Sequence, residues 1–156
     1  AKINKWYSQL QETGRFEVDA ATRERINSIF AGEYATEAEC QATISRVYEA
    51  TDYVLDPHTA VGVNCYNQYE AKQSSRRRGV VASTANPYKF SPAVLEAITN
   101  EAVTIDDEFE IIGRLNEITG WPIHPALADL EAKPIRHDHR AAQSEIRAKI
   151  AAILEL

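Results

Sequence analysis

Apolar residues recur at intervals of three and four along most of the chain, which predicts a series of amphipathic helices. Some of these runs begin with residues typical of helix starts. Thr36 and Glu39 have the spacing of a capping box, and Ser91 precedes a proline at the first helical position. The predicted helices are residues 3–13, the runs that follow Asp19 and Thr36, residues 58–71, the run from Ser91, the run that Asp106 and Asp107 open and Gly120 closes, residues 125–131 and residues 141–155.

Residues 79–84, Gly-Val-Val-Ala-Ser-Thr, form the run that most favours a strand. They are short, β-branched and without polar alternation, which predicts burial on both faces. Such a strand needs neighbours for its backbone hydrogen bonds, and only the weak extended runs 15–18 and 134–137 are available. We therefore predict an α/β fold, predominantly helical, with one clear core strand. Its missing sheet partners are expected in a part of the protein outside this chain.

Composition narrows the possible partners and the compartment. The 156 residues are 44% hydrophobic, enough for a core, and the net charge of -6 argues against nucleic-acid binding. Arg76–Arg78 is expected to be a solvated loop. No apolar run approaches the ~20 residues that span a bilayer, so no membrane partner is expected. Cys40 and Cys65 are not spaced as a CxxC pair, which predicts a reducing compartment and a cytoplasmic location.

Candidate chemistry lies at the carboxyl end of the predicted strand. Ligands of open α/β sheets bind beyond that end, and Ser83 and Thr84 stand there. Either hydroxyl could contact a ligand heteroatom or cap the following turn, and position alone favours neither reading. His137 and His139 could share one face of an extended segment, and together with His124 they could suggest a metal site. Two histidines without a clear third ligand are weak evidence for a metal, so no metal site is predicted.

Three segments carry a resemblance to a known family. Residues 83–90, Ser-Thr-Ala-Asn-Pro-Tyr-Lys-Phe, resemble the signature Ser-Thr-Ala-His-Pro-Ala-Lys-Phe of threonine synthases. Residues 53–62 are similar to the family segment that contains Asp-Pro-His-Thr-Ala, and residues 13–16 resemble its Ser/Thr-Gly-Arg/Lys-Phe/Tyr segment. The three follow one another in the family's order and at similar spacing. The resemblance covers most of the chain and weakens after about residue 120.

The resemblance implies a fold-type-II, tryptophan synthase β-like enzyme that uses pyridoxal phosphate (PLP). It would convert O-phospho-L-homoserine and water to L-threonine and phosphate. In such enzymes a Ser or Thr hydroxyl binds the pyridine nitrogen, and Thr84 matches that position best, with Ser83 as the alternative. Asn86 stands where many members have His, and Tyr88 where many have Ala. Asn86 is therefore expected to shape the turn before Pro87 and not to act in catalysis.

The sequence offers no lysine in a setting like the family's Schiff-base segment, and no Gly-rich loop for the cofactor phosphate. We therefore expect residues 1–156 to be the carboxyl-terminal segment of the catalytic region, inactive without the amino-terminal part that carries this lysine. That part, the substrate and a second copy of this chain are the expected partners. The alternative hypothesis is a non-catalytic helical interaction module. A PLP-binding lysine encoded upstream would discriminate between the two.

Overall fold

The computed structural model describes residues 2–75, 78–136 and 138–155. The chain divides into two units, Ala1–Pro122 and Ile123–Leu156. Throughout the described residues the regular structure is helical, and no strand is formed. Each of the described helices is too short or too polar to cross a bilayer.

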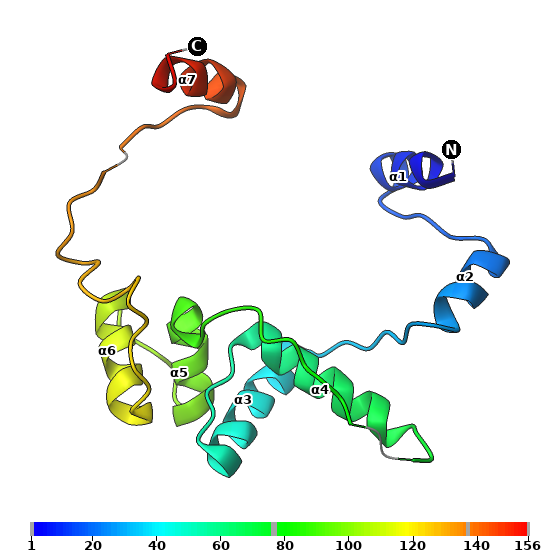
Figure 1. Ribbon diagram of the computed structural model, residues 1–156, viewed down its shortest axis with the longest axis horizontal. Coiled ribbons are helices and arrows are strands. Elements are labelled where there is room, and N and C mark those ends of the chain that lie inside the picture. Colours follow the sequence, from blue (N-terminus) through cyan, green and yellow to red (C-terminus); the bar gives the residue numbers. More distant parts are fainter. Residues whose placement is uncertain (1, 76–77, 137, 156) are drawn as a thin grey trace. The chain divides into compact units, whose positions relative to one another are not determined.

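The first unit holds most of the helices, which follow one another along the ribbon in Figure 1. They are α1 (Lys2–Thr13), α2 (Ala20–Asn27), α3 (Glu37–Thr51), α4 (Pro57–Ala71), the 3₁₀ helix η1 (Pro87–Phe90), α5 (Ser91–Thr99) and α6 (Glu108–Thr119). The second unit contains the 3₁₀ helix η2 (Gln143–Glu145) and α7 (Ile146–Ile153).

Short-range capping explains where several helices begin and end. Before α3, the Thr36 hydroxyl accepts a hydrogen bond from the Glu39 N–H at 3.3 Å, and the Glu39 carboxylate accepts one from the Thr36 N–H at 2.7 Å. This confirms the predicted capping box. Asp107 caps α6 through the N–H groups of its first turn, and Gly120 ends that helix in the left-handed conformation, with φ of 66°.

The hydrophobic core lies where α3 packs against α4 and α5, and where α5 packs against α6. The Tyr48 hydroxyl also donates a hydrogen bond to the Ile118 carbonyl, 3.2 Å away, which joins α3 to the end of α6. Burial of this apolar surface is the main source of stability for the unit. The buried apolar residues are Ile44, Val54, Leu55, Ala60, Tyr88, Val94, Leu95, Ala97, Ile111, Ile112 and Leu115.

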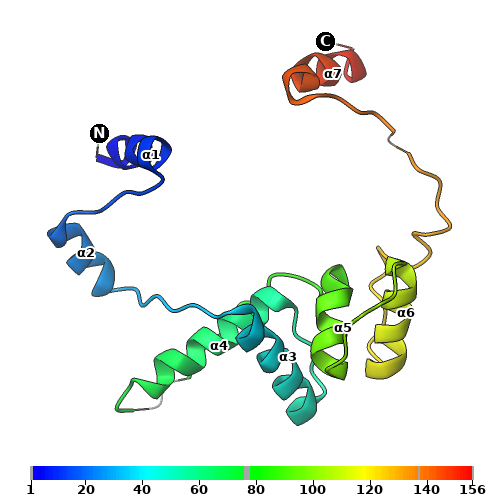
Figure 2. The same cartoon turned by 180° about the vertical axis from the view of Figure 1, so that it is seen from behind.

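Residues 79–84 form an extended segment that runs back along α4 (Figures 1 and 2), and it is not paired as a strand with any described residues. Alternate residues of this segment lie on the helix. A Cβ at Gly79 would overlap the ring of Tyr66, and a Cβ at Gly62 would lie 3.1 Å from Val81 Cγ1. Every second residue of the segment therefore contacts α4. The helix residues that they contact are three or four positions apart, so they lie on one face of α4.

The opposite face of this segment is uncovered, and here the sequence prediction is corrected. Val80 is 97% exposed and Ala82 is also exposed, so the run is not buried on both faces in this chain. One face has α4 as its neighbour, but a second face can be buried only by a partner layer. Among the described residues no second strand pairs with this run, and sheet partners outside this chain stay a prediction.

Four further predictions need correction. Ser91 does not cap α5, because η1 runs directly into that helix and makes Ser91 its first residue. Residues 125–131 form turns instead of a helix, since Asp129 has a positive φ of 60° that interrupts helical geometry. The final helix is shorter than predicted, because η2 precedes it and α7 begins at Ile146. Residues 15–18 and 134–136 form no strand, and His137 lies outside the described residues.

Candidate functional site

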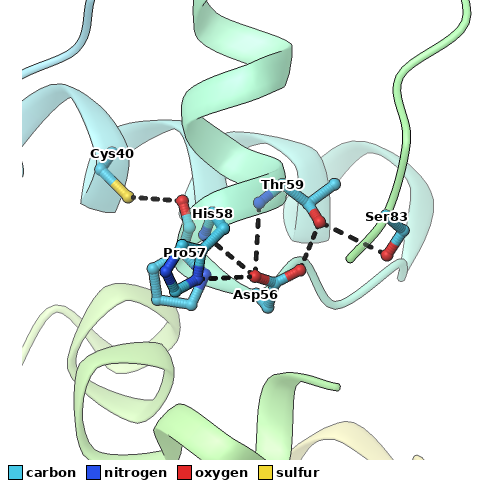
Figure 3. Close-up of polar contacts among 6 residues, drawn as sticks. All are labelled: Cys40, Asp56, Pro57, His58, Thr59 and Ser83. Carbon is cyan, nitrogen blue, oxygen red and sulfur yellow. Dashed lines mark hydrogen bonds and ion pairs between the residues drawn. The ribbon is translucent and has the colours of Figure 1, made fainter. Parts of the chain in front are cut away.

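Asp56 is a buried carboxylate at the amino end of α4 (Figure 3). Its Oδ1 atom accepts hydrogen bonds from the N–H groups of His58 at 2.9 Å and Thr59 at 3.3 Å. Its Oδ2 atom accepts a hydrogen bond from the Thr59 hydroxyl. The N-terminal turn of a helix carries a partial positive charge, and Pro57 is well suited to its first position. The carboxylate is therefore compensated although it is only 1% exposed.

Thr59 connects this cap to segment 79–84. Its hydroxyl oxygen lies 3.3 Å from the Ser83 hydroxyl oxygen, although the two residues are 24 positions apart. A threonine hydroxyl has a single proton, and here that proton is directed at the Asp56 carboxylate, the stronger acceptor. The Ser83 hydroxyl must therefore donate to Thr59. The result is a directed chain of hydrogen bonds from Ser83 through Thr59 to Asp56, drawn in Figure 3.

The structure separates the two hydroxyls that the sequence left as alternatives. Ser83 faces α4 and uses its proton on Thr59. Thr84 is exposed, and its hydroxyl has no hydrogen-bond partner among the described residues. Because successive residues of extended backbone point to opposite sides, Thr84 belongs to the uncovered face with Val80 and Ala82. Of these two hydroxyls, that of Thr84 is the one left without a partner among the described residues.

His58 lies beside the same carboxylate. Its Nδ1 atom is 3.3 Å from Asp56 Oδ1, and its ring is 4.9 Å from the ring of Phe90, centre to centre. A proton on Nδ1 can thus be donated to Asp56, which favours the tautomer whose Nε2 is an acceptor. The His58 side chain is 63% exposed. The contact with Phe90 brings together the two signature segments, 56–60 and 83–90, at a second point.

The two departures from the family signature have structural explanations. The Asn86 side chain accepts a hydrogen bond from the Tyr88 N–H at 3.0 Å, which starts η1 and confirms the turn-shaping role expected for this residue. Tyr88 is buried, and its hydroxyl donates to the Trp121 carbonyl. A tyrosine here fills part of the core and fixes the chain after α6.

Cys40 makes a structural contact between two helices. Its thiol donates a weak hydrogen bond to the Pro57 carbonyl at 3.3 Å, joining α3 to the start of α4 (Figure 3). Burial, followed by the nearby carboxylates of Glu37 and Asp56, raises the pKa of the Cys40 thiol. A raised pKa reduces the fraction of thiolate, which is the reactive form of a cysteine. Within the described part of the chain, no three His, Cys, Asp or Glu side chains come together as a metal site would require.

A groove of about 480 Å³ lies between α3 and α5, away from both signature segments. Its walls combine small residues with opposite charges, and none of them belongs to residues 56–60 or 83–90. Because the family resemblance lies in those two segments, the groove is not the candidate site. Its lining residues are Ala38, Gln41, Ala42, Ser45, Arg46, Glu49, Glu96, Ala97 and Asn100.

Comparison with known proteins bears out the resemblance seen in the signature segments. Residues 59–150, more than half of the chain, match the family model described as threonine synthase, C-terminal. The chain belongs to this family. Threonine synthase of Saccharomyces cerevisiae is 35% identical over 102 residues, which cover 62% of this chain and 20% of that protein. Threonine synthase-like 1 of Homo sapiens is 25% identical over 142 residues, covering 90% of this chain and 18% of the relative.

Solved structures of the family agree with this fold. The crystal structure of yeast threonine synthase aligns with 99% of this chain at 27% identity and a TM-score of 0.73, and the match covers 29% of that chain. PLP-bound threonine synthase of Brucella melitensis aligns with 72% at 28% identity and a TM-score of 0.57, covering 24% of its length. This chain is thus a predominantly helical, carboxyl-terminal portion of the PLP-dependent fold. It spans less than a third of each of these relatives.

Proposed function

We propose that this chain forms one wall of the active site in a PLP-dependent threonine synthase. The whole protein would convert O-phospho-L-homoserine and water to L-threonine and phosphate. The observation that carries the proposal is the free hydroxyl of Thr84, inside the family's signature segment and next to a Ser83 that is held on α4. Residues 1–156 would then be the carboxyl-terminal segment of the catalytic region.

The residues present fit one contact with PLP, a hydrogen bond between the Thr84 hydroxyl and the pyridine nitrogen. A hydroxyl can donate to that nitrogen or accept from it, and this one is exposed and without a partner among the described residues. When bound, PLP supplies the stabilisation of carbanionic charge on the substrate. A neutral hydroxyl does not force a proton onto the ring nitrogen as a carboxylate would. Thr84 would thereby moderate the electron demand of the ring, which suits elimination of phosphate.

The lysine and the phosphate-binding loop that hold PLP are expected in the amino-terminal part of the protein. The isolated 156-residue chain should therefore release no phosphate from O-phospho-L-homoserine, because covalent catalysis has no anchor. The test is a coupled phosphate assay on the purified chain with added PLP. Steady turnover by the chain alone would disprove this part of the proposal.

The cofactor contact is tested in the longer protein by substitutions at both hydroxyls. Thr84→Val keeps the side-chain volume but leaves the ring nitrogen unpaired, at a cost of roughly 1–3 kcal/mol. Turnover should fall about ten- to a hundredfold, with a change in the PLP absorbance. Thr84→Ser retains the hydroxyl and should keep much of the activity. Ser83→Ala should matter less.

Two outcomes would contradict this assignment. Near wild-type turnover of Thr84→Val together with a severe loss in Ser83→Ala would mean that Ser83 is the cofactor ligand. Full activity of both variants would remove the cofactor role from this segment altogether. Absence of turnover and of PLP binding in the unmodified longer protein would favour the non-catalytic module instead.

The proposed partners and location follow from the same picture. Besides the substrate, the rest of the protein is expected to cover Val80 and Ala82, whose exposed edge has unpaired backbone groups. When that part is absent, a second copy of the chain can pair with the edge, so sedimentation should reveal self-association that rises with concentration. Cys40 and Cys65 are both free thiols, which supports a cytoplasmic protein. Cell fractionation of the tagged protein tests the location.

A further inference from the structure

Segment 79–84 is attached to α4 by contacts of two kinds. Gly79 and Val81 touch the helix by van der Waals packing, which permits small sliding movements. Ser83 is attached by a hydrogen bond to the Thr59 hydroxyl, which has a preferred direction. Among the described residues, this is the directional contact that immediately precedes Thr84. The orientation of Thr84 therefore depends on whether Ser83 is held.

We propose that Asp56 and Thr59 are positioning residues, which act through Ser83 to set the direction of the Thr84 hydroxyl. The proposal rests on the proposed function, because it takes Thr84 as the group that meets the cofactor. It assigns Ser83 to positioning and thus gives separate tasks to neighbouring hydroxyls. None of the three positioning residues needs to touch cofactor or substrate.

The buried end of the chain of hydrogen bonds is rigid. Asp56 is fixed by two backbone N–H groups of the first turn of α4 and cannot turn away without leaving them unpaired. The Asp56 carboxylate in turn holds the hydroxyl of Thr59, a β-branched residue with few accessible rotamers. The oxygen that Ser83 meets is therefore presented from one place on the helix.

The exposed end follows from backbone geometry. In extended chain the side chain at one position determines which side the next one occupies. If Ser83 stays on α4, Thr84 must point away from the helix. If Ser83 is released, nothing else on the described chain directs the Thr84 side chain. Preorganisation of a binding group over this short distance improves binding by reducing the ordering that the ligand must impose.

The direct test is backbone and side-chain NMR relaxation of the 156-residue chain without cofactor. Four variants are compared with the wild type: Thr59→Val, Thr59→Ser, Ser83→Ala and Thr43→Val. Thr43→Val is the matched control, because Thr43 is as buried as Thr59 but lies on α3. Its hydroxyl donates to the Glu39 carbonyl and accepts from the Asn64 side chain of α4, and neither bond involves segment 79–84. The measured quantities are the order parameter and the side-chain rotamer populations of Thr84.

We expect Thr59→Val and Ser83→Ala to lower the backbone order parameter of Thr84 from about 0.85 to below about 0.6. The Thr84 side chain should then populate more than one rotamer. Thr59→Ser should stay close to wild type because it retains the hydroxyl. Thr43→Val should leave Thr84 unchanged. The double variant Thr59→Val/Ser83→Ala should be no worse than either single one, since both break the same link.

Ser83→Ala decides the matter if Thr59→Val fails to fold, because Ser83 is exposed and its removal opens no cavity. An unchanged Thr84 in folded Ser83→Ala would overturn the proposal. So would a loss in Thr59→Ser as large as that in Thr59→Val, since it would indicate a packing role for the methyl group.

Kinetics of the longer protein separate this inference from the function itself. Thr59→Val and Ser83→Ala should lower kcat by up to about tenfold while KM for O-phospho-L-homoserine changes little, since positioning affects the cofactor and not substrate capture. If Thr84 loses order in the NMR experiment but Thr84→Val has no kinetic effect, the positioning inference stands and the cofactor role fails. If Thr84→Val is impaired and Thr84 keeps its order in Ser83→Ala, the cofactor role stands and the positioning inference fails.

Discussion

Ile44 in α3 is fully buried, whereas Val80 in segment 79–84 is 97% exposed, although both are β-branched apolar residues. The difference lies in how the backbone is satisfied. A helix makes its hydrogen bonds within itself, so α3 can bury one side simply by packing on α4 and α5. Extended backbone must find partners elsewhere, and α4 offers side chains but no ladder. The helices of the core therefore need no partner for their backbone hydrogen bonds, whereas segment 79–84 has a neighbour on one face only.

The largest expected change in unfolding free energy comes from a substitution in the helical core. Leu115 in α6 is 1% exposed, so Leu115→Ala should lower the free energy of unfolding by about 2–5 kcal/mol through lost burial and the cavity left behind. Chemical unfolding followed by far-UV circular dichroism measures the loss. The matched control is Val80→Ala, which should stay within about 0.5 kcal/mol of wild type. Comparable losses in both variants would show that Val80 is buried in solution.

A middle-sized effect is expected at the start of α3. Thr36→Ala removes the side-chain acceptor of the Glu39 N–H and should cost about 1 kcal/mol of unfolding free energy. The same unfolding titration measures it. Thr36→Ser retains the capping oxygen and serves as the control. No difference between the two variants would mean that the cap contributes nothing to the stability of the core.

The other half of this capping box should respond to pH. Hydrogen bonds from the Thr36 backbone and side chain lower the pKa of Glu39 below its ordinary value of 4.5. Its contribution to stability is therefore complete above pH 4.5 and is lost as the pH falls through the lower folded pKa. Glu39→Gln cannot titrate and should show a weaker decline over this range. Identical pH profiles of the two proteins would contradict the assignment.

The smallest effect on global stability is expected from Gly79→Ala, which acts on the segment and not on the core. The added methyl group would overlap the Tyr66 ring, so the segment should move away from α4 at this point. We expect NMR shift changes that are confined to Tyr66 and segment 79–84, with unfolding free energy altered by about 0.5 kcal/mol or less. Gly32→Ala is the control, because a Cβ there meets nothing within 4 Å. Loss of global stability in Gly79→Ala would place the segment inside the cooperative core.

Features that depend on near neighbours in sequence could be predicted from the sequence. Asp19, Thr36, Asp56 and Asp107 cap the helices that follow them, and Pro57 occupies the first position of α4. Each of these signals involves groups no more than three residues apart. The turns that replace the helix predicted at 125–131 depend on the backbone of Asp129, which residue pattern alone did not reveal.

The site could be predicted only in part. The signature segments indicated that Ser83 and Thr84 matter, and alternation indicated that they face opposite ways. Which one faces α4 depends on Thr59, which lies 24 residues before Ser83. No local pattern specifies such a contact. The Asp-Pro-His-Thr motif carried a usable signal, since a cap residue followed at the third position by a hydroxyl places both at the same helix end.

The alternation of segment 79–84 along α4 also determines where the chain tolerates changes in length. Residues added between Ala71 and Gly79 would enlarge a connector without shifting the contacts that begin at Tyr66. One residue added between Gly79 and Ser83 would exchange the two sides of the run, turning one hydroxyl outward and the other inward. Natural or engineered variants should thus accept insertions before Gly79 far more readily than between Gly79 and Thr84. The change from tolerated to harmful insertions should occur at Gly79 itself.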